Sequence, residues 1–230
     1  MTSTIMAVLN VTFSAFSRQK EDREKLNQNA RKVYVMWAFV MFPLMCGLIA
    51  VAEDMFRVLL PEVWLPAVPY LRILSIAGLL APLSVISYNL VKVCDDGNMI
   101  FRIEFIKKLI ATAVLAVTIP IGVKAIAWGQ VAIFVSDMVV NCLTAHRYVP
   151  EWSLWSRAKD ALPYLAVTGL MCGFVWLVGV VGAALNLSLW VVFVAKIFLG
   201  AGFYALLAEL FHLAAWRELK EIIVGYFPKK

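Results

Sequence analysis

Long runs without charge divide this chain of 230 residues and constrain its fold more than any other feature. An α-helix needs about 20 apolar residues to cross a hydrocarbon layer of about 30 Å. Six segments qualify as membrane-spanning helices: 33–52, 73–91, 106–123, 125–143, 161–185 and 187–208. The third is the weakest, because its uncharged core, 109–123, has only 15 residues. The predicted fold class is an all-α, polytopic membrane bundle of about six transmembrane helices.

The composition excludes an ordinary soluble protein. Hydrophobic residues make up 63% of the chain and charged residues 16%, against about 45–50% and about 25% in soluble domains. The net charge of +6 would suit a nucleic-acid partner only as a basic face on a soluble fold, so no nucleic-acid partner is expected. Four cysteines without CxxC spacing are interpreted as small hydrophobes, and neither a metal nor another cofactor is expected.

The basic residues predict the orientation of the spans. Alternate connections (1–32, 92–108, 144–160 and 209–230) hold 17 Lys and Arg, whereas the opposite connections hold three, Arg57, Arg72 and Lys124. Because connections rich in Lys and Arg face the cytoplasm, both termini are predicted to be cytoplasmic.

The connection after the first span has the sequence LLPEVWLPAVPYLRIL, residues 59–74. Trp64 and Tyr70 suit the aromatic belt at a membrane surface, and Pro61, Pro66 and Pro69 keep the connection from continuing as one helix. We interpret this stretch as the first outer loop. A purely anchoring role is the alternative.

Residues 5–16 form an apolar piece too short to span a membrane, and they are interpreted as the end of a helix whose beginning is absent. Three regions are therefore predicted. Residues 1–32 hold this helix end and a cytoplasmic amphipathic connection, 33–145 form four spans, and 146–230 form two C-terminal spans and a cytoplasmic tail.

An ordered set of motifs resembles one known family. The motifs are FSAFSRQKEDREKL (13–26), FPLMCGLIAVAED (42–54), LLPEVWLPAVPYLRILSIAGLLAPL (59–83), then Asn89, Lys92 and IEFIKKLI (103–110). The chain resembles the polysaccharide or O-antigen flippases of the multidrug/oligosaccharidyl-lipid/polysaccharide exporter superfamily. The most specific stretch contains Trp64, Pro66 and Pro69.

The resemblance implies a transporter of the bacterial inner membrane that moves undecaprenyl-pyrophosphate-linked oligosaccharides for polysaccharide and lipopolysaccharide biosynthesis. Such transporters have two six-helix lobes, often with two further C-terminal helices, and this chain resembles the second lobe and those two helices. A truncated or half-length form is therefore expected. Its partners would be the lipid bilayer, the lipid-linked oligosaccharide, and either a first-lobe polypeptide or further copies of itself.

Polar side chains inside the predicted spans are candidates for the substrate path. An ionisable residue at the membrane centre costs about 2.5–3.5 kcal/mol on insertion scales and seldom lacks a role. Asp137 lies seven residues after Gln130 and four before Asn141, so helical periodicity places all three on one face. Lys196, in the last span, lies at a depth that allows a pair with Asp137. Alternatively, both side chains extend toward the membrane surfaces.

Four basic residues bracket the second cytoplasmic connection: Lys92, Arg102, Lys107 and Lys108. A pyrophosphate entering from the cytoplasm would need such cations. The alternative is the positive-inside bias with attraction to anionic lipid, about 1 kcal/mol per basic residue. Glu104 lies four residues before Lys108, which predicts an intrahelical pair, and Asn89 joins the candidates because it shares a helix face with Lys92.

Two other functions stay open at this point. The chain could be a non-transporting assembly partner or a remnant of a transporter. It could also be an integral-membrane glycosyl or acyl transferase, although its connections hold no clustered His, Asp or Glu at catalytic spacing and an enzyme is not expected.

Overall fold

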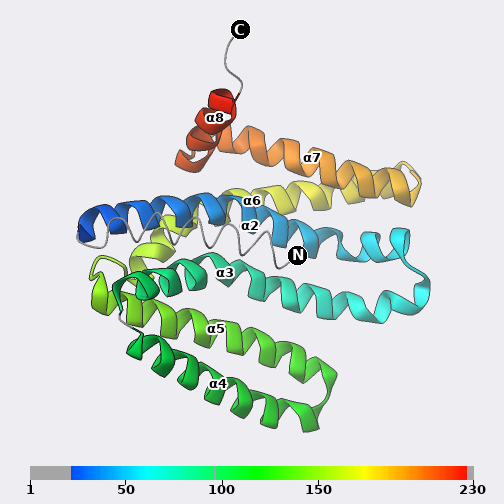
Figure 1. Ribbon diagram of the computed structural model, residues 1–230. Helices are drawn as coiled ribbons and strands as arrows, with labels where there is room; N and C mark the ends of the chain where they lie inside the picture. The colour runs from blue at the N-terminus through cyan, green and yellow to red at the C-terminus, as the bar shows by residue number, and fades with distance from the viewer. Residues whose placement is uncertain (1–21, 96, 227–230) are drawn as a thin grey trace. The chain divides into compact units, whose positions relative to one another are not determined.

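The computed structural model describes residues 22–95 and 97–226, and all regular structure in this part of the chain is helical (Figure 1). The predicted helix end at 5–16 lies outside the described residues. The elements are α2 (Arg23–Leu59), η1 (Glu62–Ala67), α3 (Val68–Cys94), α4 (Asn98–Thr118), η2 (Ile119–Ile121), α5 (Val123–Tyr148), α6 (Leu154–Ala184), α7 (Leu189–Leu210) and α8 (Ala214–Tyr226). The all-α class is therefore confirmed.

Five helical segments are long and apolar enough to cross a membrane: Arg23–Leu59, Glu62–Cys94, Val123–Tyr148, Leu154–Ala184 and Leu189–Leu210. The third predicted span, 106–123, corresponds to the end of α4 and to η2 and is not among these five. Its apolar stretch follows the charges of residues 102–108 directly, so every stretch of 18 residues within α4 contains four charges, whereas the charges of α2 lie toward its two ends. The chain is thus a polytopic helical membrane protein, and α4 is not among its helices that are long and apolar enough to cross a membrane.

The described residues form two compact units. Unit 1 comprises residues 22–37 and 80–160, and unit 2 comprises residues 38–79 and 161–226, so α2, α3 and α6 contribute to both. The division into 1–32, 33–145 and 146–230 stays a prediction.

In unit 1, α4 and α5 run side by side as a hairpin closed by η2 (Figure 1). Gly129 lets the two helices approach closely, because a Cβ there would lie 2.9 Å from Cγ2 of Thr118. Small residues at helix contacts are typical of membrane bundles, where lipid offers little hydrophobic drive for association. Gly122, with φ of 124°, allows the turn into α5.

The connection from α3 to α4 is fixed by Asp95. Its Oδ2 accepts hydrogen bonds from the backbone N–H groups of Gly97 and Met99, both at 2.9 Å, and its Oδ1 accepts one from the Tyr148 hydroxyl at 3.0 Å. Burial acts to raise the pKa of Asp95, but these hydrogen bonds outweigh it and lower the pKa below its usual 3.8. The ionised carboxylate therefore caps α4 and ties it to α5.

In unit 2, the second part of α2 packs with α6 and α7. Phe39 contacts the rings of Tyr164 and Tyr204, and the Tyr204 hydroxyl donates to the Phe39 carbonyl at 2.8 Å. Trp216 of α8 packs against the same ring with centroids 6.0 Å apart. Aromatic contacts therefore hold α2, α6, α7 and α8 together.

Candidate functional site

Two lysines of unit 1 meet at one aromatic ring. The Nζ of Lys92 lies 4.6 Å from the centroid of the Tyr88 ring, and the Nζ of Lys107 lies 4.8 Å from it. Tyr88 and Lys92 are one turn apart on α3, whereas Lys107 comes from α4. Both distances are within the range of about 6 Å for a cation–π contact. The ring thus gathers two positive charges from two helices.

Glu104 supplies the counter-charge of this cluster. The Nζ of Lys107 donates to its Oε1 at 2.8 Å. Burial acts to raise the pKa of Glu104, but hydrogen bonds from Lys107 and Tyr88 outweigh it and hold the pKa below its usual 4.5. The pair predicted between Glu104 and Lys108 is wrong. Lys107 is the partner, and Lys108 is exposed. We call Tyr88, Lys92, Glu104 and Lys107 the Tyr88 cluster.

Three buried or half-buried polar residues lie on the neighbouring parts of α3 and α5. Asn141 is buried, and its Nδ2 donates to the Oγ of Ser84 at 3.0 Å, which links α5 to α3. Nδ2 of Asn89 and Oδ1 of Asp137 are buried and have no hydrogen-bond partner among the described residues. The charges that act on Asp137 are those of Lys107, Glu104 and Lys108. Asp137 therefore lies within the electrostatic reach of the Tyr88 cluster.

Two of the predicted residues stand apart. Arg102 is exposed on α4, and Gln130 is half-buried on α5. In the described part of the chain, neither forms a hydrogen bond or ion pair with the cluster. Gln130 precedes Asp137 by about 10 Å of helix at 1.5 Å per residue, so a shared face does not bring it to the same depth.

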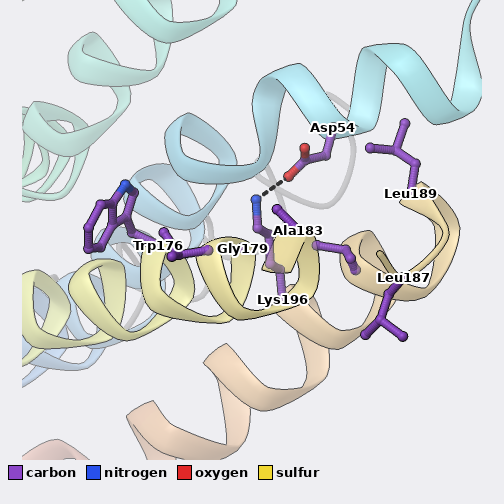
Figure 2. A pocket seen from close by; sticks show the side chains of 9 residues that line it. Asp54, Trp176, Gly179, Ala183, Leu187, Leu189 and Lys196 are labelled. Carbon is purple, nitrogen blue, oxygen red and sulfur yellow. Dashed lines mark hydrogen bonds and ion pairs between the residues drawn. The ribbon is translucent and has the colours of Figure 1, made fainter. Parts of the chain in front are cut away.

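Lys196 belongs to a different site, in unit 2. Its Nζ lies 2.5 Å from Oδ2 of Asp54, so the pair considered between Lys196 and Asp137 is not formed and Asp54 is the partner. The pair lies beside a cavity of about 490 Å³ whose lining includes Trp176 (Figure 2). Gly179 makes room for the lysine, since a Cβ there would lie 2.7 Å from Cε of Lys196.

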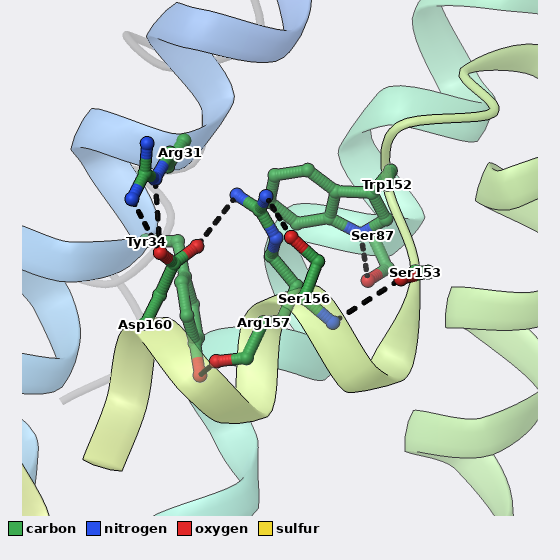
Figure 3. A network of polar contacts seen from close by, with 8 residues as sticks. All are labelled: Arg31, Tyr34, Ser87, Trp152, Ser153, Ser156, Arg157 and Asp160. Atoms are coloured by element: carbon green, nitrogen blue, oxygen red, sulfur yellow. Dashed lines mark hydrogen bonds and ion pairs between the residues drawn. The ribbon is translucent and has the colours of Figure 1, made fainter.

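A third polar site, not predicted from the sequence, is a network in unit 1 at the start of α6 (Figure 3). Asp160 accepts hydrogen bonds from Nε and Nη2 of Arg31 at 3.0 and 2.5 Å and forms an ion pair with Nη1 of Arg157 at 3.1 Å. The Arg157 guanidinium lies over the Trp152 ring at 4.7 Å, and Trp152 Nε1 donates to Ser87 Oγ at 2.9 Å. The i,i+3 spacing of Arg157 and Asp160 was the available signal, but Arg31 is 129 residues from its partner.

The predicted outer loop, 59–74, is mostly helical, because η1 occupies Glu62–Ala67 and α3 begins at Val68. Trp64 is exposed on η1, Pro66 lies within η1, and Pro69 lies in the first turn of α3. A proline is tolerated in a first turn, because that turn has no intrahelical acceptor for its missing N–H. An exposed Trp between two apolar helices is compatible with an anchoring role and with a family motif alike.

Comparisons with known proteins match part of the chain. Residues 1–69 match a family model described as polysaccharide biosynthesis protein. An uncharacterized membrane protein in the cps region of Klebsiella pneumoniae is 30% identical over 108 residues, 47% of this chain and 22% of that protein. The teichuronic acid biosynthesis protein TuaB of Bacillus subtilis (strain 168) is 34% identical over 73 residues, and the lipopolysaccharide biosynthesis protein WzxC of Escherichia coli (strain K12) is 32% identical over 73 residues. Each of these two matches covers 32% of this chain and 15% of the relative. No solved structure matches the chain.

Proposed function

We propose, from the resemblance to polysaccharide flippases and from the matches to polysaccharide biosynthesis proteins, that the chain is part of a transporter for surface polysaccharide biosynthesis. Its cargo would be an oligosaccharide linked to undecaprenyl pyrophosphate, moved from the cytoplasmic to the outer leaflet of the inner membrane. The matched segments span 22% or less of the relatives, so this activity is proposed for an assembly to which the chain contributes.

The physical problem of such a transporter lies in the head of the cargo. The prenyl tail can stay in hydrocarbon, but a charged pyrophosphate and its sugars cannot cross without a polar path. Transporters of this general kind open a central site to each side in turn by rocking one helix bundle against another. No covalent bond has to be made or broken, so the chain needs cations at the right place rather than a catalytic group.

The observation that carries the proposal is the Tyr88 cluster. Lys92 and Lys107 converge on one ring near the connection of α3 and α4, where an anionic head would arrive from the cytoplasm in the predicted orientation. Ammonium groups form short, charge-assisted hydrogen bonds to phosphate oxygens. A general positive-inside bias would distribute lysines over the surface, and it does not require two of them to share a ring.

The proposed orientation, in which the segment of α4 and η2 also crosses the membrane as the sequence predicts, places both termini in the cytoplasm and the loop with Trp64 outside. In this arrangement the Tyr88 cluster receives the head, and Asp137 and Asn141 lie deeper on α5. We further propose that a first-lobe polypeptide or a second copy of the chain forms the opposite wall of the path.

Complementation in a flippase-deficient strain tests the proposal. The chain would be expressed alone and with a first-lobe polypeptide, and surface polysaccharide would be measured. We expect surface polysaccharide to be restored in at least one arrangement and to be lost in the K92Q/K107Q variant. K124Q, which removes a cation in the first turn of α5, should still restore it. Inserted protein that never restores polysaccharide with either arrangement would contradict active transport and favour a non-transporting assembly role.

A further inference from the structure

We infer that Glu104 is an internal competitor in the Tyr88 cluster, and that it sets a charge threshold which favours polyanionic heads over singly charged phospholipids. This inference rests on the proposed function, because it concerns the ligand of the same site. It assigns to Glu104 a role in specificity that is separate from the role of the lysines in binding.

Without a ligand, the Tyr88 cluster holds two positive charges close together. Each ammonium lies within 5 Å of the Tyr88 centroid, so the two are within about 10 Å of each other, the distance over which salt screens exposed charges. Two like charges this close disfavour each other, and an anion between them relieves the repulsion. Glu104 provides an anion at one of the two, because its carboxylate accepts a hydrogen bond from Lys107 at 2.8 Å.

The carboxylate of Glu104 lies where a phosphate would bind Lys107. The bond from Lys107 Nζ to the carboxylate, 2.8 Å long, has the length that an ammonium also adopts with a phosphate oxygen, about 2.7–2.9 Å. The carboxylate therefore occupies a place on Lys107 that a phosphate would take. An arriving phosphate also repels the carboxylate, since like charges at short range are unfavourable. The ammonium has three N–H donors and Glu104 occupies one of them, so binding of the head and the contact between Glu104 and Lys107 weaken each other.

The carboxylate of Glu104 can rotate away from Lys107. Its side chain is 38% exposed, whereas that of Lys107 is 13% exposed. Rotation about its side-chain torsions brings the carboxylate into solvent without moving α4, because these torsions have several staggered positions of similar energy. The lysine stays in place on the ring while its partner is exchanged.

The consequence is selectivity by charge. A phospholipid with one negative charge replaces one carboxylate by one phosphate, which leaves the electrostatic energy of the cluster nearly unchanged. A pyrophosphate carries more charge than the carboxylate that it displaces, so it gains from both Lys92 and Lys107. Abundant singly charged lipids of the same leaflet would thus be kept off the site.

The test measures binding of two ligands to the purified chain in neutral detergent micelles: farnesyl pyrophosphate, and dihexanoyl phosphatidylglycerol as the singly charged lipid. We expect the unmodified chain to bind the pyrophosphate and not the phosphatidylglycerol. E104Q should bind the pyrophosphate about fivefold more tightly, which corresponds to about 1 kcal/mol for a partly exposed ion pair, and should gain measurable binding of phosphatidylglycerol. E151Q, which removes an exposed acid between α5 and α6, should change neither affinity.

The outcomes separate the inference from the proposed function. Pyrophosphate binding that K107Q weakens but E104Q leaves unchanged or weakens would overturn the competitor role and leave the anion site standing. Absence of pyrophosphate binding in the unmodified chain and in E104Q alike would overturn the anion site itself. Equal gains in E104Q and E151Q would reduce Glu104 to a general charge effect and would also overturn the inference.

Discussion

The ion pair between Arg157 and Asp160 is the contact whose loss should harm unit 1 most. The two side chains are 4% and 9% exposed, whereas Arg31, which also bonds Asp160, is 58% exposed. The substitution Asp160→Asn keeps the shape of the side chain and removes its charge. Among the residues that the structure describes, the buried Arg157 side chain then keeps only the Trp152 ring and Ser156 as partners.

The expected magnitude follows from this burial. Removing one partner of a buried ion pair costs about 3–5 kcal/mol. We expect the lower end, about 3 kcal/mol, because the cation–π contact with Trp152 persists. Arg31→Gln breaks an exposed pair with the same aspartate, and solvent screening limits its cost to about 0–1 kcal/mol. The two variants therefore separate burial from the number of hydrogen bonds lost, since Arg31 makes two.

Alkylation of Cys142 reports the opening of this region. The thiol is 1% exposed and hydrogen bonds with Ser87, the acceptor of Trp152. In a parent with the other three cysteines replaced by alanine, the rate of maleimide labelling follows the population of the open form when reclosing is fast. Asp160→Asn should raise the rate about 150-fold, the equivalent of 3 kcal/mol, and Arg31→Gln by no more than about fivefold.

A second change tests the reason for the effect. In the double variant R157M/D160N the uncompensated charge is gone, so labelling should be slower than in D160N alone. Labelling of D160N within about fivefold of the parent, or faster labelling of R31Q than of D160N, would refute the argument that the buried pair holds the start of α6.

Three further predictions concern other contacts. Asp54→Asn and Lys196→Met should each destabilise unit 2 by about 2 kcal/mol, as for a hydrogen bond between charged groups. The double variant should be destabilised by less than the sum of the two. Midpoints of SDS-induced unfolding measure these losses, and additive losses would contradict coupling between the two side chains. The pKa of Asp95 lies below 3.8 in the folded chain, so its contribution to stability is complete above pH 3.8 and is lost as the pH falls through the folded value. Asp95→Asn should therefore unfold more easily than the parent at neutral pH and by a smaller margin as the pH falls below 3.8, and an unchanged difference would exclude the carboxylate as the cause. Gly129→Val should separate α4 from α5, because a Cβ at this position lies 2.9 Å from Thr118. A loss of less than about 1 kcal/mol in the free energy of unfolding would contradict this and would show that the helices adjust to the larger side chain.

The sequence predicted the helices well and the partners of individual side chains poorly. Uninterrupted apolar runs are a local signal, so the helical class and the break between the first two spans near Trp64 could be predicted. The third span could not be settled in this way, because the charges of 102–108 and the apolar stretch after them lie on one continuous helix.

Side-chain partners depend on contacts between distant segments, which periodicity does not report. Asp137 and Lys196 looked like partners because each was an isolated charge within a span, yet the lysine pairs with Asp54, which had been assigned only to a sequence motif. Tyr88 was missed for a related reason. A tyrosine within an apolar run resembles a core residue until the two lysines over its ring are known.

Side-specific labelling across α3 tests the central claim, that the Tyr88 cluster faces the cytoplasm. Single cysteines would replace Trp64 before α3 and Asn98 after it, in a chain without native cysteines, and intact cells would be treated with a membrane-impermeant maleimide. The proposed orientation predicts labelling of position 64 in intact cells and of position 98 only after permeabilisation. Labelling of both positions from the same side, or of position 98 alone in intact cells, would contradict it.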